Sequence, residues 1–400
     1  MVSGCSHSPA TSSSEPSHQS IGSSSRPRSK PPAAAIASAH PLATQAGIEI
    51  LERGGNAFDA AIAVASVLAV VEPSGSGLGG GGFWLLHRAR DGKQVMLDSR
   101  ETAPLAAHRD LFLDENKQVL PGKSLDGALA AGIPGVPAAL VHLSKNYGQL
   151  PLTTTLAPAI ELAQHGFLLD EHLLKLMRFR QKAIQTSPAA ASIFLDHGKV
   201  PGSGTRLVQT DLAHTLSTLA KQGHDGFYKG EIAEKLVASV KHSGGIWSLT
   251  DLARYHVIER KPIAGDYQGA RIISAAPPSS GGLVLMETLN ILNGYALNQL
   301  DRATRKHLIV EAWKRAYRDR AEYMGDPDFV NIPVERLLSQ NYADALKTTI
   351  RNDVALPSQY LAAPQAEIQQ GNNTTHFSVL DKSGNRVAAT LSINYPFGSG

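Results

Sequence analysis

The chain has 400 residues, of which 42% are hydrophobic and 18% are charged, a balance typical of a globular protein with one or two domains. Its formal net charge is only +3, and no basic run with interleaved aromatics occurs, so the composition does not indicate a nucleic-acid partner. No window reaches the roughly 18 apolar residues of a membrane span, and the single cysteine, Cys5, excludes an internal disulfide and a cysteine-based metal site.

Residues 1–32 are rich in Ser and Pro and lack hydrophobic periodicity, which predicts a disordered tail. Within it, Val2–Cys5 fits the end of a bacterial lipoprotein signal, in which the cysteine becomes the lipidated first residue. The charged and apolar regions that precede such a cysteine are not in the sequence, so either Met1 is a misplaced start or the match is chance. If the match is real, we expect a periplasmic or extracellular protein that is lipid-anchored through Cys5.

Regular structure is expected from residue 33 onward. A short strand over 34–38 leads into a helix that the glycine pair at 54–55 terminates. Asn56 opens a second helix, which is small and apolar nearly all round as far as Val71. Such a pattern predicts a helix that is buried on every side.

The stretch Ser74–His87 holds a run of glycines and continues into an apolar strand. A phosphate-binding loop is one interpretation, but the Gly-Lys-Ser/Thr ending is missing and no helix follows. The favoured interpretation is that glycine allows the backbone to approach another segment closely.

The next strand, over 94–97, ends just before Arg100. An arginine at a strand end is commonly a plain surface charge. A substrate with a free α-carboxylate, however, needs a planar partner with two donors, which arginine supplies and lysine does not. From the residues alone, both interpretations of Arg100 stay open.

Helices are predicted over 155–165, 171–181, 232–240 and 283–292, and a strand over 271–276. The scattered histidines of this region lack the i, i+4 pairing of a metal-binding helix. Before the helix at 283–292, the turn with Ser279 and Ser280 is compatible with an anion site, but a routine helix cap is favoured. In the helix around 311–320, charged residues are expected to face solvent or another subunit. Its predicted buried stripe consists of Ile309, Ala312, Trp313, Ala316 and Tyr317.

Two alternating segments, 372–380 and 386–394, flank Asp381–Asn385, where turn-forming residues gather. This pattern predicts a β-hairpin, and a three-residue loop with Gly384 in the left-handed conformation is a common solution. The register then pairs Asp381 with Asn385, Ser378 with Ala388, His376 with Thr390, and Thr374 with Ser392. One face of the hairpin carries Thr374, His376, Thr390, Ser392 and Asn394, and the core face carries Phe377, Val379, Leu391 and Ile393.

The polar face of this hairpin has two interpretations. Thr and Ser are good strand residues, and the face is then simply solvated. Alternatively, Thr374 is a latent N-terminal nucleophile, because a cut before it frees an α-amino group that can act as general base for its own hydroxyl. Ser392, directly opposite, would orient that hydroxyl.

The hairpin and the segment Asn394–Gly400 resemble the processing site of the γ-glutamyltransferase (glutathione hydrolase) family of N-terminal nucleophile hydrolases. Further segments are similar to that family in the same order, namely Ser74–His87, Asp98–Pro104, Ala130–Pro137, Pro277–Gly282 and Glu311–Asp328. The resemblance implies an α+β fold, the four-layer αββα sandwich in which helices cover both outer faces of two stacked sheets.

The resemblance also implies autocleavage between Asn373 and Thr374, with Thr374 as the nucleophile and Ser392 as its support. Arg100 would bind the substrate's α-carboxylate, and Asn394 would contact its α-amino end. The implied reaction transfers the γ-glutamyl group of glutathione or a related compound to water or to an amino-acid or dipeptide acceptor, through a threonine ester and without metal or organic cofactor.

Cleavage would give a large-subunit part, 33–373, and the start of a small subunit, 374–400, which together form a heterodimer. The second part is much shorter than the family's small subunit, so we expect a fold incomplete at its C-terminus and a truncated chain that is inactive or poorly folded alone. Two alternatives stay open, a related acylase such as a cephalosporin acylase and an inactive fragment or binding relic.

Overall fold

The computed structural model describes residues 30–361 and 374–400. The described residues from 31 onward belong to one compact unit. Cys5 and nearly all of the predicted N-terminal tail lie outside the described residues, so the expectations for them stay predictions.

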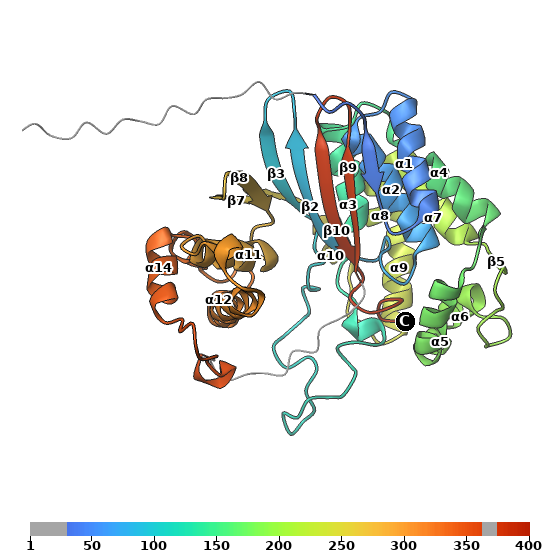
Figure 1. Cartoon of the computed structure of the whole chain (residues 1–400). Helices are drawn as coiled ribbons and strands as arrows, with labels where there is room; N and C mark the ends of the chain where they lie inside the picture. The colour runs from blue at the N-terminus through green and yellow to red at the C-terminus, as the bar shows by residue number, and fades with distance from the viewer. Residues whose placement is uncertain (1–29, 362–373) are drawn as a thin grey trace, which may run out of the picture. The chain divides into compact units, whose positions relative to one another are not determined.

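Helices and strands are mixed along the chain, which confirms the α+β class (Figure 1). The strands are β1 (Ala35–Ala37), β2 (Gly81–Arg88), β3 (Lys93–Asp98), β4 (Phe167–Leu168), β5 (Arg206–Leu207), β6 (Ile258–Arg260), β7 (Ile263–Tyr267), β8 (Ala270–Ser274), β9 (Thr375–Leu380) and β10 (Arg386–Ser392). The α-helices are α1 (Pro41–Glu52), α2 (Ala57–Val71), α3 (Val136–Asn146), α4 (Leu152–His165), α5 (Glu171–Thr186), α6 (Pro188–Phe194), α7 (Thr210–Gln222), α8 (Asp225–Tyr228), α9 (Gly230–His242), α10 (Leu249–Arg254), α11 (Gly281–Leu292), α12 (Arg302–Tyr323), α13 (Val334–Leu337) and α14 (Gln340–Thr348). Short 3-10 turns occupy Ala128–Ala130, Leu297–Gln299 and Ser358–Tyr360.

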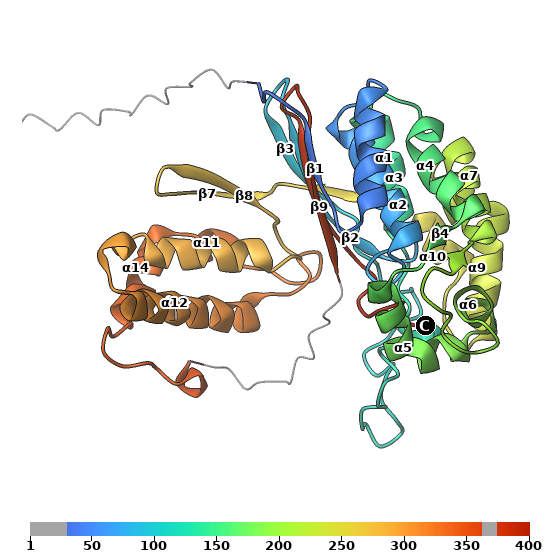
Figure 2. The same ribbon diagram turned by 45° about the vertical axis from the view of Figure 1, so that its right-hand side comes forward.

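The main sheet has the strand order β1-β9-β10-β2-β3-β6, and every neighbouring pair is antiparallel. Helices α1, α2 and α3 cover one of its faces (Figure 2). Every residue of α2 is buried, because other helices pack on one side of it and strands β9 and β10 on the other. The predicted all-round burial of this helix is confirmed.

Strands β9 and β10 pair in the predicted register, with Thr390 opposite His376. Their loop turns through Gly384 at φ 93°, as expected. The buried carboxylate of Asp381 accepts the backbone N–H groups of Asn385, at 2.9 Å, and of Ala57, at 2.9 Å. The hairpin loop is therefore tied to the first residue of the buried helix α2.

The second face of the main sheet carries Phe83, Leu85 and Met96. These side chains pack in one cluster with Ile263 of β7 and Leu283 of α11, and helices α12 and α14 pack on α11. The order of helices, sheet, second sheet and helices is that of the expected αββα sandwich, with β7–β8 as the second sheet within the described residues.

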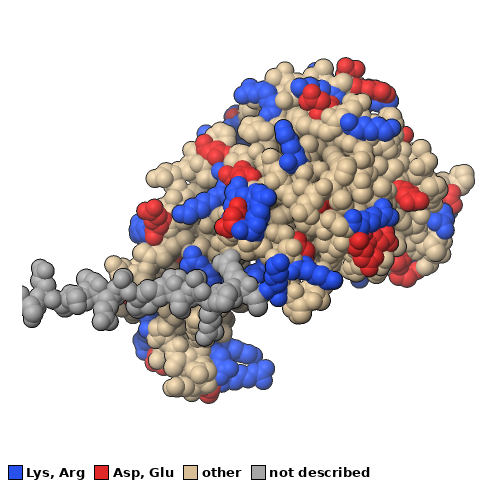
Figure 3. All heavy atoms as spheres, turned by 90° about the horizontal axis from the view of Figure 1, so that it is seen from above, with Lys and Arg blue, Asp and Glu red and all other residues tan. Residues whose placement is uncertain are grey.

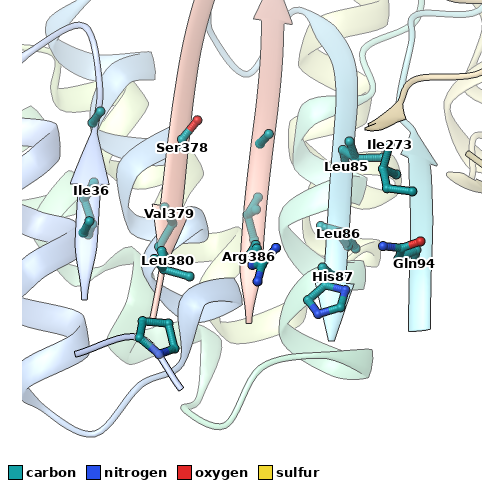
Figure 4. A pocket seen from close by; sticks show the side chains of 15 residues that line it. Ile36, Leu85, Leu86, His87, Gln94, Ile273, Ser378, Val379, Leu380 and Arg386 are labelled. Carbon is teal, nitrogen blue, oxygen red and sulfur yellow. The ribbon is translucent and has the colours of Figure 1, made fainter. Parts of the chain in front are cut away.

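Part of this second face forms a groove of about 510 Å³ over β1, β9, β10, β2 and β3. Figure 4 shows Leu85 and Ile273 along one side of it and Ser378 and Leu380 along the other. Side chains alternate between the two faces along each strand, so every second residue of β9 and β10 points away from the α2 core. These residues line the groove.

The structure corrects the predicted buried stripe of α12. Ala312 and Ala316 are buried as expected, and the partly buried Ile309 packs against the cluster that contains Ala312. Trp313 is 51% exposed and Tyr317 is 52% exposed, so the aromatic part of the prediction is wrong.

Charged residues of α12 occupy the buried face instead, namely Glu311, Arg315 and Asp319. The guanidinium of Arg315 donates to a carboxylate oxygen of Glu311 at 2.9 Å and to the backbone carbonyl of Thr349 at 2.7 Å. A charge with such partners can be buried, and the expectation that these residues face solvent is wrong.

Ser280 precedes α11 but does not cap it with its side chain. Its hydroxyl instead accepts a hydrogen bond from Nε of Arg320 at 2.9 Å. The favoured interpretation as a helix cap is therefore wrong for this side chain, which joins α11 to α12.

A buried carboxyl pair makes stability depend on pH. Burial raises the pKa of Glu287, and the neighbouring carboxyl of Asp319 raises it further against the opposing cation of Arg318. Because the pKa of Glu287 is higher in the folded state than in the unfolded state, its contribution to the stability of the fold is complete at low pH and is lost as the pH rises.

We expect Glu287→Gln to increase the free energy of unfolding at about pH 8.5 by about 1 to 3 kcal/mol, with little change at about pH 4.5.

Urea denaturation at the two pH values measures this difference. Glu322→Gln, which changes an exposed glutamate of α12, is the matched control and should leave the pH dependence as it is. An identical pH dependence in Glu287→Gln and the unchanged protein would contradict the assignment.

Candidate active site

The glycine run brings two distant segments against the first residues of β2. A Cβ atom on Gly80 would lie 2.3 Å from the carbonyl oxygen of Ser392, and a Cβ on Gly81 would lie 2.9 Å from the Cα of Arg100. No side chain fits at such distances, so glycine is required at both positions. The predicted close backbone approach is confirmed, and its two partners are the end of β10 and the segment after β3.

Thr374 and Ser392 form a hydroxyl pair. Thr374 is exposed immediately before β9, and its Oγ1 donates to Oγ of Ser392 at 3.3 Å. The same Ser392 oxygen accepts the backbone N–H of Asn394 at 2.9 Å. Asn373, the other side of the predicted scissile bond, lies outside the described residues, so autocleavage stays a prediction.

Arg100 and Asn394 line one cavity of about 550 Å³. The Arg100 side chain is 45% exposed, which leaves its guanidinium accessible to a ligand. Among the described residues that line this cavity, neither Thr374 nor Ser392 is found. The four predicted site residues therefore form two pairs, and the Ser392–Asn394 hydrogen bond connects them.

Three further lining residues were not predicted, namely Ser76, Glu101 and Trp247. Burial raises the pKa of the Glu101 carboxyl, while the adjacent cation of Arg100 acts in the opposite direction. The Ser76 hydroxyl is buried without a hydrogen-bond partner among the described residues, so it is available to a ligand. The position of Glu101 next to Arg100 was a usable signal, whereas nothing in the sequence pointed to Trp247.

Arg180 of α5 holds the loop that follows β10. Its buried guanidinium donates to the carbonyl oxygens of Pro396, at 2.9 Å, and Gly398, at 3.1 Å, and it forms an ion pair with Asp126. It also lies 4.7 Å from the ring centre of Tyr395. These contacts fix one wall of the cavity, and their sequence separation explains why no local pattern predicted them.

Charges of both signs are intermixed on the face of the molecule shown in Figure 3. Across residues 30–361 and 374–400, no three His, Cys, Asp or Glu side chains gather in a way that could hold a metal ion. In the same residues, no helix has the length and apolar character needed to cross a membrane.

The family model described as Gamma-glutamyltranspeptidase matches residues 43–400. The chain is 42% identical over 367 residues to the glutathione hydrolase proenzyme of Pseudomonas sp. (strain A14), a match that covers 91% of this chain. The crystal structure of Helicobacter pylori gamma-glutamyltranspeptidase aligns with TM-score 0.80 and 39% identity over 84% of this chain and 97% of that one. The cephalosporin acylase from Bacillus halodurans aligns with TM-score 0.80 and 31% identity over 95% of this chain and 69% of that one.

The chain therefore belongs to the gamma-glutamyltranspeptidase family, and its fold is of the N-terminal nucleophile hydrolase type. The family predicted from the hairpin and the glycine run is confirmed. The chain spans 64% of the length of the Pseudomonas relative and 63% of the length of the glutathione hydrolase proenzyme of Escherichia coli (strain K12).

The close approach at Gly80 can be tested within the glycine run itself. We expect Gly80→Ala to lower the free energy of unfolding by about 2 to 4 kcal/mol, because the added methyl group collides with the Ser392 backbone. Gly79→Ala is the matched control, since a Cβ there meets no atom within 4 Å. Thermal and urea unfolding of the two variants measure the difference, and equal stabilities would show that the approach is looser than described.

Proposed function

We propose that this protein is an autoprocessing γ-glutamyl acyltransferase and hydrolase that cleaves the γ-glutamyl amide of glutathione and related compounds. The observation that carries the proposal is the Thr374–Ser392 hydroxyl pair, joined through Asn394 to a cavity with an accessible arginine. Two relatives at 40% identity or more are named glutathione hydrolase proenzyme, which supports both the substrate and the processing.

Processing would break the Asn373–Thr374 peptide bond. The new α-amino group of Thr374 then takes the proton from its own Oγ1 during attack, the threonine form of a nucleophile with an adjacent base. Ser392 orients the Thr374 hydroxyl across the hairpin, at the 3.3 Å oxygen–oxygen distance. The two pieces, 33–373 and the part that begins at Thr374, stay together as a heterodimer.

The proposed reaction is an acyl transfer in two steps. Thr374 Oγ1 bonds to the γ-carbonyl carbon, the amide C–N bond breaks, and the leaving amine takes the proton held by the α-amino group. Water, or the amino group of an amino acid or dipeptide, then attacks the threonine ester and releases the γ-glutamyl group. Arg100 pairs with the α-carboxylate and Asn394 with the α-amino end, which places the γ-carbonyl beside the nucleophile.

A related acylase is the second candidate, favoured by the alignment with a cephalosporin acylase over 95% of this chain. A γ-glutamyl-anilide and a glutaryl-anilide differ only in the α-amino group, so their relative kcat/KM separates the two functions. The third candidate is an uncleaved relative that has lost catalysis and only binds a ligand, which an intact Asn373–Thr374 bond in the native protein would favour.

For location, we propose the periplasm or the extracellular space, with a lipid on Cys5.

Thr374 is tested by the intact mass of the protein purified from its native source. We expect two species that meet at Asn373/Thr374, and a single uncut species for Thr374→Ala. The alanine variant should lose γ-glutamyl-anilide turnover by a factor of about 10³ or more, because the nucleophile is absent. Thr374→Ser, which keeps a hydroxyl, is the control and should retain cleavage; a fully active alanine variant would refute the role.

Arg100 is tested by a change that keeps its charge. We expect Arg100→Lys to raise KM for the γ-glutamyl-anilide about tenfold or more, because an ammonium group cannot form the two-donor pair with a carboxylate. Arg90→Lys, an exposed arginine between β2 and β3, is the matched control. Equal KM values in the two variants would leave Arg100 as a plain surface charge.

A further inference from the structure

The Arg100 side chain is loosely held. Its recorded side-chain contacts among the described residues are an ion pair with Glu101, at 3.4 Å, and the ring of Phe83, 6.0 Å from the guanidinium carbon. Neither contact fixes the plane of the guanidinium. The Arg100 backbone, however, sets the point from which this side chain starts, and so the region that the guanidinium can reach.

That backbone is held from both sides by side chains. The Arg100 N–H donates to Oδ1 of Asp98 at 3.1 Å, and the Arg100 carbonyl accepts the hydroxyl of Tyr255 at 2.8 Å. Because these two groups belong to the peptide planes that flank the Arg100 Cα, the two hydrogen bonds together restrain its φ and ψ.

An ion-pair chain anchors the Asp98 side of this arrangement. The second carboxylate oxygen of Asp98, which is 7% exposed, accepts Nε of Arg260 at 2.8 Å. The two terminal nitrogens of Arg260 bind both oxygens of Asp328, at 3.0 and 2.7 Å. A buried carboxylate requires such a cation, and Asp328 connects it to the loop after α12.

A stack of three rings anchors the Tyr255 side. Tyr255 stacks on Tyr228 at 5.4 Å between ring centres, and Tyr228 stacks on His224 at 4.4 Å. His224 in turn donates to the Tyr255 carbonyl at 2.9 Å. Burial raises the pKa of Tyr255, so its hydroxyl keeps the proton that it donates to Arg100.

We propose that Tyr255 and the Asp98–Arg260 ion pair are positioning residues that hold Arg100 in the orientation needed to meet a substrate α-carboxylate. This inference rests on the proposed role of Arg100. Neither Tyr255 nor Arg260 lines the cavity that contains Arg100, so both act through the Arg100 backbone and not on the substrate.

Tyr255→Phe removes one hydroxyl from the stack and nothing else. We expect KM for the γ-glutamyl-anilide to rise about tenfold while kcat changes less than about twofold, because ground-state anchoring is lost and the nucleophile is untouched. Tyr228→Phe is the matched control. It removes a buried hydroxyl of the same stack that binds Pro134 and Ala138 instead of Arg100, and KM should stay unchanged.

Arg260→Gln tests the other anchor, with Arg271→Gln, which breaks an exposed ion pair with Asp266, as its control. In the Arg100→Ala background, we expect Tyr255→Phe and Arg260→Gln to have no further effect on KM, because the group they position is gone. An equal effect in both backgrounds, or a fall in kcat with unchanged KM, would overturn the proposal.

Hydrogen exchange of the Arg100 amide tests the positioning without catalysis. We expect exchange to become about tenfold faster or more in Tyr255→Phe and in Arg260→Gln, and to be unchanged in the two control variants. Unchanged exchange in Tyr255→Phe would overturn the proposal whatever the kinetics. If the unaltered protein does not release the γ-glutamyl group at all, the proposed function fails, and the exchange rates alone decide whether Arg100 is held in this way.

Discussion

The arrangement of the site depends on the absence of side chains at the start of β2. Gly80 lies against the Ser392 backbone and Gly81 against Arg100, so one stretch of glycine allows two segments to close on the same strand from opposite sides. The buried helix α2 packs beneath this region against β9 and β10, and Asp381 ties its first turn to the hairpin loop. The backbones that carry Ser392 and Arg100 can therefore lie this close to the glycine run because Gly80 and Gly81 have no side chains.

Three arginines and one carboxyl pair of the described residues show how charged groups are accommodated away from solvent. Arg180 and Arg315 are buried, and the Arg260 side chain is 16% exposed; each binds a carboxylate and a further acceptor, so that desolvation of the guanidinium is offset by hydrogen bonds. One of these arginines, Arg180, connects helix α5 to the loop after β10, which lines the cavity. The carboxyl pair is Glu287 and Asp319, where two carboxyls meet and one retains its proton to a higher pH than usual.

Much of the fold was accessible from the sequence, and the hairpin shows why. Apolar and polar residues alternate along β9 and β10, and this alternation favours one pairing register. The turn residues around Gly384 independently favour the same register, which is the one observed. The placement of Trp313 on α12 failed because helical spacing alone cannot tell that Arg315 finds Glu311 as a buried partner. In the site, Arg100 and the Thr374–Ser392 pairing were within reach of local patterns. The contacts of Arg180 and Tyr255 were not, because each joins segments that are distant in the sequence and carry no shared motif.

The strand order has a consequence for a chain that is cut before Thr374. Strands β9 and β10 come after the cut, yet they lie between β1 and β2, which come before it. The hairpin is therefore enclosed by hydrogen-bonded ladders on both edges, and its apolar face is sealed against α2. Separation of the two products would require both ladders to open together, with loss of the core. A cut before Thr374 would therefore give that residue a free α-amino group without releasing either piece, and the two pieces would unfold as one unit.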